Sequence, residues 1–258
     1  MSNEKTEIGM VNPCDYDKVV KKLRIFFTQK NFIEVHVQSR LSILAACEDP
    51  TTIATFNYSG QVWPLPQTGQ MWLEHELLKS PKTPGFFCVS TSYRNEPNPN
   101  PERHEKIFPM VEFEFKGDIE DLISFEKELC EYLEFPTNGS DEKYPRGKYK
   151  DVAKFYKVTE LAHNHEGFLK DDYDCVFFLT DFPNYTSPFW NMAQVKKEDC
   201  AKKVDVIING VETIGSAERS SDPDEMRRRF DTISNGMYAK TLYAGFTKNE
   251  LKRNSRTF

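Results

Sequence analysis

The sequence predicts an α+β fold in which an antiparallel β-sheet is flanked by helices. Two pairs of strand-like runs support this prediction. In the first pair, residues 87–93 and 109–115 are apolar or alternating runs joined by a polar, proline-containing loop, as in a hairpin. In the second pair, residues 204–208 and 211–214 flank an Asn-Gly dipeptide, which is typical of two-residue hairpin turns. Amphipathic segments of helical length lie around these hairpins, so we expect helices to cover the sheet.

The first third of the chain is expected to form a helix, a strand, a hairpin and a second helix. Asp15–Lys30 places apolar residues at near-helical spacing, with basic residues on the other face. Residues 32–37 alternate like a strand, and residues 56–63 have the pattern of a hairpin. The loop at residues 65–70 then leads into a helix over Met71–Leu78.

Beyond the first hairpin, the spacing predicts three more helices, a loop and a strand. The helices are Asp118–Leu133, Val158–Gly167 and Pro223–Gly245, the loop is Thr137–Lys150, and the strand is Cys175–Thr180. Asp222 is a suitable N-cap for the last helix, because its carboxylate can accept backbone N–H groups of the first turn and proline is favoured at the first helical position.

Composition narrows the class of protein. The chain has 258 residues and a formal net charge of −6, without a dense Lys/Arg stripe, which argues against non-specific nucleic-acid binding. No apolar run approaches the length of a membrane span, and the first ten residues lack a signal-peptide pattern. Six scattered cysteines form no C-x-x-C pair, so reduced thiols and a cytoplasmic location are expected.

Charged and aromatic side chains are concentrated in the loop of the first hairpin. They are Arg94, Glu96, Arg103, His104 and Phe108. Guanidinium groups bind phosphate oxygens bidentately, an aromatic face can stack on a base, and carboxylates can bind Mg²⁺. The cluster therefore suits a nucleoside triphosphate, although a charged hairpin loop without a ligand is the alternative.

Residues 91–117 resemble motif 2 of the class II aminoacyl-tRNA synthetases, in their aspartyl and asparaginyl branch. The family pattern is an aromatic residue, Arg-x-Glu, a loop, Arg-His and a Phe followed by alternating carboxylates; Ile107 stands where the family usually has Glu. The resemblance implies that Arg94 bridges the ATP α-phosphate and the substrate carboxylate, that Arg103 and His104 approach the outer phosphates, that Phe108 stacks under adenine, and that Glu96 contacts the adenine edge or the substrate amine. Residues 15–37 resemble motif 1, which implies a homodimer.

Two further segments resemble the parts of this family that bind the amino acid. In Leu65-Pro-Gln-Thr-Gly-Gln70, the resemblance implies that Gln67 binds the substrate amino group, and Gln70 stands where aspartyl enzymes carry a lysine. In residues 180–192, it implies that Asp181 and Asn191 face the amino-acid pocket. The alternatives are a loop before a helix for the first segment and core packing of aromatic residues for the second.

The second hairpin carries a pattern of carboxylates and an arginine. Asp205 and Glu212 bracket the Asn-Gly turn and are expected to point into one cleft, and Arg219 follows. The resemblance implies that Asp205 and Glu212 hold Mg²⁺ and that Arg219 binds the side-chain carboxylate of the substrate. Gly215 stands where asparaginyl enzymes have glycine and aspartyl ones have serine. The alternative is a surface Glu/Arg ion pair.

Residues 1–258 are expected to form a single catalytic domain with neither an N-terminal anticodon-binding barrel nor a recognisable motif 3. The resemblance is then to stand-alone asparagine synthetases related to asparaginyl-tRNA synthetase, which implies ATP and Mg²⁺ as cofactors, aspartate and ammonia as substrates, and Arg94, Glu212 and Arg219 as catalytic residues. We do not expect tRNA or a membrane as a partner. Two alternatives stay open: a non-catalytic paralogue that binds or dimerises, and a fragment of a tRNA ligase.

Overall fold

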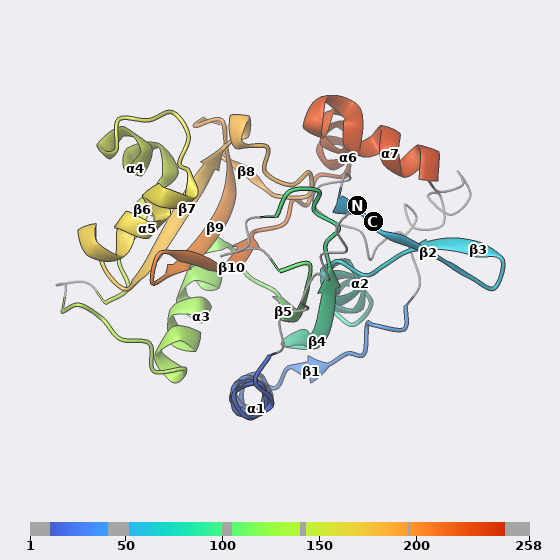
Figure 1. Cartoon of the computed structure of the whole chain (residues 1–258), viewed down its shortest axis with the longest axis horizontal. Coiled ribbons are helices and arrows are strands. Elements are labelled where there is room, and N and C mark those ends of the chain that lie inside the picture. The colour runs from blue at the N-terminus through green and yellow to red at the C-terminus, as the bar shows by residue number, and fades with distance from the viewer. Residues whose placement is uncertain (1–10, 41–51, 100–104, 140–142, 196, 246–258) are drawn as a thin grey trace, which may run out of the picture. The chain divides into compact units, whose positions relative to one another are not determined.

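The computed structural model describes residues 11–40, 52–99, 105–139, 143–195 and 197–245. The chain divides into two compact units. The first comprises Met1–Lys116 and Lys240–Phe258, and the second comprises Gly117–Ala239. In both units helices pack beside sheets whose strand pairs are mostly antiparallel, so the predicted α+β class is confirmed (Figure 1). Among the described residues, no helix combines the length and apolarity needed to cross a bilayer.

The first unit follows the predicted order of elements. They are α1 (Pro13–Gln29), β1 (Ile33–Glu34), β2 (Thr55–Tyr58), β3 (Gln61–Pro64), α2 (Gln70–Lys79), β4 (Gly85–Tyr93) and β5 (Ile107–Phe115). The strand expected over residues 32–37 is shorter, since only Ile33 and Glu34 pair with β4, in parallel register. Ser59 and Gly60, both with positive φ, form the turn between β2 and β3.

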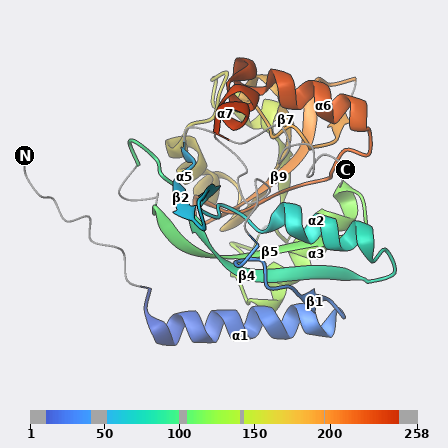
Figure 2. The same ribbon diagram turned by 90° about the vertical axis from the view of Figure 1, so that its right-hand side faces the viewer.

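The β4–β5 hairpin is covered on both faces by helices of its own unit (Figure 2). On the face toward α1, the ring of Phe27 stacks on Phe87 at 4.8 Å and lies 5.4 Å from Phe113. The opposite face carries Cys88 and Glu112 toward the start of α2. The period-2 alternation of β5 therefore separates a phenylalanine face from a carboxylate face.

The second unit is built on one sheet with strand order β10-β9-β7-β6 and β8 paired to β9. Its elements are α3 (Ile119–Tyr132), β6 (Arg146–Lys148), α4 (Tyr149–Phe155), α5 (His163–Asp172), β7 (Val176–Pro183), the 3₁₀ turn η3 (Asn184–Thr186), β8 (Gln194–Val195), β9 (Cys200–Ile208), β10 (Val211–Ala217), α6 (Pro223–Thr232) and the 3₁₀ turn η4 (Ile233–Gly236). The last helix, α7 (Met237–Gly245), crosses the boundary between the units. Only β6 and β7 run parallel in this sheet.

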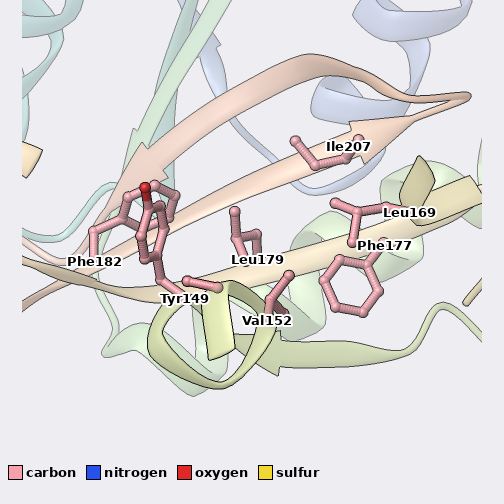
Figure 3. Close-up of a cluster of buried hydrophobic side chains, with 8 residues drawn as sticks. Tyr149, Val152, Leu169, Phe177, Leu179, Phe182 and Ile207 are labelled. Atoms are coloured by element: carbon pink, nitrogen blue, oxygen red, sulfur yellow. The ribbon is translucent and has the colours of Figure 1, made fainter. Parts of the chain in front are cut away.

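A core of buried side chains fixes α4 and α5 against one face of this sheet (Figure 3). Phe177, Leu179 and Ile207 come from β7 and β9, Val152 from α4 and Leu169 from α5, and each is at most 2 % exposed. Burying a large apolar side chain of this kind contributes about 1.5–3 kcal/mol. Asp205 lies on the same face of β9 as Ile207, because the two residues are separated by two positions.

Three predicted elements need correction. The segment Thr137–Lys150 is not all loop, because it contains β6 and the start of α4. The helix predicted over Val158–Gly167 begins only at His163, after Lys157 turns the chain with a φ of 59°. The helix predicted over Pro223–Gly245 is broken at Ser234 and Asn235, whose φ values of 52° and 55° are left-handed. The cap at Asp222 is confirmed, since its carboxylate accepts the N–H groups of Asp224 and Glu225.

Candidate functional site

The first group of predicted site residues lies where β4 ends and β5 begins. The backbone N–H of Arg94 donates to the carbonyl of Lys106 at 2.8 Å, so the hairpin pairing continues just beyond the strands. The guanidinium of Arg94 lies 5.4 Å from the centre of the Phe108 ring. This arrangement presents a cation and a half-buried aromatic face together, and such a pair is attractive by about 0.5–2 kcal/mol. Glu96 is half-buried near this end of the hairpin.

Two predicted residues of this group, Arg103 and His104, lie outside the described residues. Their assignment to the outer phosphates therefore stays a prediction.

Gln67 is fixed in the loop before α2. The side chain is 2 % exposed, and its Nε2 donates to Thr52 Oγ1 at 2.9 Å. The hydroxyl of Ser92 donates to the carbonyl of Gln67 at 2.8 Å, which ties the loop to β4. The amide oxygen Oε1 is buried and has no hydrogen-bond partner among the described residues. A buried acceptor without a donor is costly, so this oxygen is well suited to receive an ammonium group of a ligand.

Glu112 is a residue of this group to which the sequence argument assigned no role. Its carboxylate accepts hydrogen bonds from the Thr68 hydroxyl, from the Gly69 N–H at 2.7 Å and from the Ser90 hydroxyl at 3.1 Å. Burial raises the pKa of Glu112, and these donors oppose that rise. Glu112 therefore anchors the loop that carries Gln67 to strand β5. The signal in the sequence was the alternation Glu112-Phe113-Glu114, which places both carboxylates on one face.

Gln70 and Gly69 sit at the start of α2. The Gln70 N–H donates to Thr68 Oγ1 at 3.0 Å, and Gln70 is the first residue of the helix. A Cβ added to Gly69 would lie 2.7 Å from Val37 Cγ2 and 2.8 Å from Cys88 Sγ. The loop thus approaches β4 as closely as a glycine permits, and this contact fixes the position from which Gln70 starts the helix.

In the second unit, Asp205 and Glu212 border the same space. They lie on neighbouring strands, and Gly215 pairs with Asp205 across the ladder. A Cβ on Gly215 would lie 2.8 Å from Glu212 Oε1 and 3.5 Å from Asp205 Oδ1. The two carboxylate oxygens therefore approach the same position, which is the one that a side chain at residue 215 would occupy. The prediction that the two carboxylates converge is consistent with this geometry.

Asp205 is a buried carboxylate with a lysine beside it. It is 4 % exposed, and its Oδ2 accepts a hydrogen bond from Lys203 Nζ at 2.7 Å. Burial raises the pKa of Asp205 to about 7; Lys203 lowers it and the carboxylate of Glu212 raises it further. Its other oxygen, Oδ1, has no hydrogen-bond partner among the described residues.

These two carboxylates match the oxygen ligands that Mg²⁺ prefers. Mg²⁺ commonly uses one or two protein carboxylates and completes its shell with water and phosphate oxygens. Within the described parts of the chain, no cluster of three or more His, Cys, Asp or Glu side chains is placed to hold a metal by itself. Asp205 Oδ1 and Glu212 Oε1 therefore fit a Mg²⁺ site whose remaining ligands are water and phosphate oxygens, rather than a site formed by protein side chains alone.

Asn191 and Arg219 are neighbours through the backbone. Met192 and Arg219 form an antiparallel bridge, and the Ser220 N–H donates to the Asn191 carbonyl at 2.7 Å. Asn191 is fully buried, and Arg219 is half-buried. The structure thus brings Asn191 and Arg219 close together along the backbone, and their assignment to the amino acid stays a prediction.

Asp181 has a different setting from these two. It lies at a bulge in β7 with a φ of 57°, and its carboxylate is 3.3 Å from Lys148 Nζ. Lys148 also contacts Glu198 at 2.8 Å. A non-glycine residue with positive φ stores strain, which often accompanies a functional position. The structure thus identifies Lys148 as a partner of Asp181 that the sequence pattern gave no reason to expect.

Comparison with known proteins places this geometry in a family. The family model of the tRNA synthetases class II (D, K and N) matches residues 16–250. An asparagine–tRNA ligase of Pelotomaculum thermopropionicum is 23 % identical over 238 residues, which cover 81 % of this chain and 54 % of that protein. An aspartate–tRNA(Asp) ligase of Thermoplasma volcanium is 22 % identical over 233 residues, with coverages of 81 % and 53 %. The chain thus spans little more than half the length of these relatives.

Solved structures share the fold. The asparaginyl-tRNA synthetase of Pyrococcus horikoshii, complexed with asparaginyl-adenylate, has a TM-score of 0.74 at 19 % identity. The match covers 93 % of this chain and 58 % of that protein's chain. The aspartyl-tRNA synthetase of Entamoeba histolytica has a TM-score of 0.67 at 17 % identity, with coverages of 93 % and 49 %. The likeness extends over nearly the whole chain, well beyond the segments in which motifs were found.

Proposed function

Since this chain belongs to the tRNA synthetases class II (D, K and N), we propose that it activates aspartate with ATP and passes the aspartyl group to ammonia, giving asparagine. An oxygen of the side-chain carboxylate of aspartate attacks the α-phosphorus, and pyrophosphate leaves. Ammonia then attacks the carbonyl carbon of the adenylate, AMP leaves with the bridging oxygen, and a proton passes to solvent. No covalent enzyme intermediate is required, so binding and charge stabilisation carry the reaction.

The observation that carries the proposal is the pairing of Arg94 with Phe108, next to the buried Gln67 loop. Arg94 would stabilise charge on the α-phosphate, and the Phe108 ring would stack on adenine. Glu96 is assigned to the adenine edge or the substrate amine. Gln67 Oε1, buried and without a donor among the described residues, would accept the ammonium group of the amino acid. Gln70 is assigned to the amino-acid side chain.

The second unit supplies the residues assigned to the amino acid and the metal. Arg219 would bind bidentately the carboxylate of aspartate that is not activated, which is the α-carboxylate when asparagine is the product, and Asn191 and Asp181 are assigned to the same substrate. Asp205 and Glu212 would hold Mg²⁺, which when bound would neutralise charge on the phosphate oxygens. The oxygens that border Gly215 support this assignment.

Ammonia and tRNA are the two acceptors to distinguish. The names of the relatives support tRNA, because they are tRNA ligases. The net charge of −6 supports the smaller acceptor, because tRNA binding depends on the neutralisation of phosphates. Purified protein with ATP, Mg²⁺ and aspartate should release AMP when ammonium is added. AMP formation that requires tRNA, with none from ammonium, would assign the second acceptor.

Pyrophosphate exchange tests the activation step without an acceptor. We expect exchange that depends on aspartate, and a loss of at least about tenfold in kcat/KM for ATP in Phe108→Leu, which keeps an apolar residue but removes the stacking face. Phe155→Leu is the matched control, since Phe155 is a 59 % exposed ring of the second unit. Exchange with asparagine in place of aspartate would change the substrate assignment. Absence of ATP binding by calorimetry would favour a non-catalytic binding or dimerisation module.

A further inference from the structure

Lys203 places a positive charge at the candidate metal site. The side chain extends from β9, two residues before Asp205 on the same face of the strand. Its Nζ lies 2.7 Å from Asp205 Oδ2 and 4.2 Å from the centre of the Phe182 ring. The side chain of Lys203 is 22 % exposed and that of Asp205 is 6 % exposed. A carboxylate and an aromatic face thus hold this ammonium group, largely away from water.

The two oxygens of Asp205 have different surroundings. Oδ2 accepts from Lys203, whereas Oδ1 borders the space over Gly215 that Glu212 Oε1 also borders. Lysine and the assigned Mg²⁺ would therefore share one carboxylate. When both are ionised, the two carboxylates carry two negative charges, and Lys203 neutralises one of them before any metal binds.

We propose that Lys203 is a resident cation of the Asp205–Glu212 pair that keeps its affinity for free divalent cations low. Mg²⁺ then binds well only where phosphate oxygens of a nucleotide supply the remaining ligands and negative charge. This inference rests on the proposed function in assigning the metal to this pair. It adds that the protein itself supplies part of the positive charge that a metal would otherwise provide.

Calorimetric titration with Mg²⁺, in the absence of nucleotide and amino acid, tests the proposal directly. Lys203→Met removes the charge and keeps the length of the side chain. We expect this variant to bind Mg²⁺ at least about tenfold more tightly than the natural protein, because a unit positive charge a few ångströms from the ion repels it. The titration is done at pH 8.5, where ionised carboxylates are favoured in both proteins.

Lys202→Met is the matched control. Lys202 is the neighbouring residue on β9, its side chain is 30 % exposed, and its Nζ lies 2.7 Å from Glu218. It resembles Lys203 in length, burial and ion pairing, but its partner is not one of the assigned metal ligands. The Lys202→Met variant should bind Mg²⁺ with the same affinity as the natural protein. The Lys203→Arg variant, which keeps the charge, should do so too.

A double variant locates the bound ion. Adding Glu212→Gln to Lys203→Met should abolish the gain in affinity, because it removes one of the two assigned ligands. Equal Mg²⁺ affinity in Lys203→Met and the natural protein would overturn the inference, as would a gain that survives Glu212→Gln. Lys203→Gln replaces the Met variant if thermal unfolding shows that it does not fold. Since no substrate is present, this result is independent of the pyrophosphate exchange that tests the proposed function.

Discussion

Among the described residues of the second unit, Glu126 on α3 is a fully buried carboxylate, and its burial disfavours the ionised form. It is 0 % exposed, and burial raises its pKa from 4.5 to about 8. The folded protein therefore keeps a proton that the unfolded chain releases above about pH 4.5. The free energy of unfolding should fall as pH rises from about 4.5 to about 8, by an amount on the order of a few kcal/mol.

Urea unfolding at a series of pH values measures this dependence. Glu126→Gln cannot ionise, so its stability should fall less over this range than that of the natural protein. Some slope remains in the variant because burial also raises the pKa of Asp205 and Glu112. Glu128→Gln, an exposed position on the same helix, should follow the natural protein. Identical slopes in the Glu126 variant and the natural protein would contradict the assignment.

A second residue-scale prediction concerns Glu112. Glu112→Gln replaces one accepting oxygen with an NH₂ group, which would face the donors on Thr68, Gly69 or Ser90. We expect a loss of about 2 kcal/mol in the free energy of unfolding, because a buried hydrogen-bond donor left without its acceptor costs about 1–3 kcal/mol. Glu34→Gln is the control: this carboxylate is 41 % exposed and pairs with Arg24 at the surface, so about 1 kcal/mol or less is expected.

At the scale of single residues, the sequence identified side chains whose own chemistry suggests a ligand. It missed residues whose role depends on contacts that form only in the folded protein. Arg94 and Phe108 were singled out because a guanidinium and an aromatic ring in one loop suggest a nucleotide. The roles of Glu112 and Lys203 depend on contacts with residues brought close by the fold, such as Thr68, 44 positions away in the chain. Composition and spacing along the chain carry no information about such partners.

At the scale of elements, the turn between β9 and β10 shows how local chemistry determines a hairpin. Asn209 and Gly210 have φ values of 51° and 81°, as a two-residue turn of this kind requires. A Cβ added to Gly210 would also lie 2.8 Å from the Cα of Gly167. Gly210→Ala therefore combines an unfavourable φ with a clash against backbone, and we expect it to lower the free energy of unfolding by about 2–3 kcal/mol or more.

Gly139→Ala separates the two effects. Gly139 belongs to the same unit and has a φ of 82°, but nothing lies within 4 Å of a Cβ added there. The free energy of unfolding of this variant should fall only by the cost of the unfavourable φ, about 1 kcal/mol. Urea unfolding of both variants gives the comparison, and an equal loss in the two would show that the contact with Gly167 contributes nothing.

Elements with strong local signals were predicted well, and those fixed by distant contacts were not. The helix α3 was predicted within a residue at each end, because Asp118 caps it and its apolar residues keep helical spacing. The strand β6 has only three residues and forms by pairing with β7, about 30 positions later. The break at Ser234 and Asn235 was missed because both residues are tolerated in a helix and only their backbone conformation reveals it.

At the scale of the whole molecule, a few motif residues identified a family, and the two solved structures compared above share less than a fifth of their residues with this chain. The TM-score of 0.74 at 19 % identity shows that the fold has been kept while most side chains have changed. The alternation of β5 and the Asn-Gly hairpin survive that divergence, since both follow from backbone geometry rather than from particular partners. The parallel pairing of β1 with β4 was not predictable, because it joins residues about 50 positions apart.

The remaining prediction concerns assembly, and it rests on the resemblance of residues 15–37 to motif 1. In that segment Val19, Ile25 and Ile33 are 48 %, 50 % and 52 % exposed, which is unusual for three aliphatic residues so close in sequence. We expect the protein to sediment at twice its chain mass of 30.0 kDa. Ile25→Glu should shift it toward the monomer, because a charge in an apolar interface is costly. Val62→Glu, a 46 % exposed position on β3, should leave the dimer intact. A natural protein that sediments as a monomer at micromolar concentration would refute the assignment.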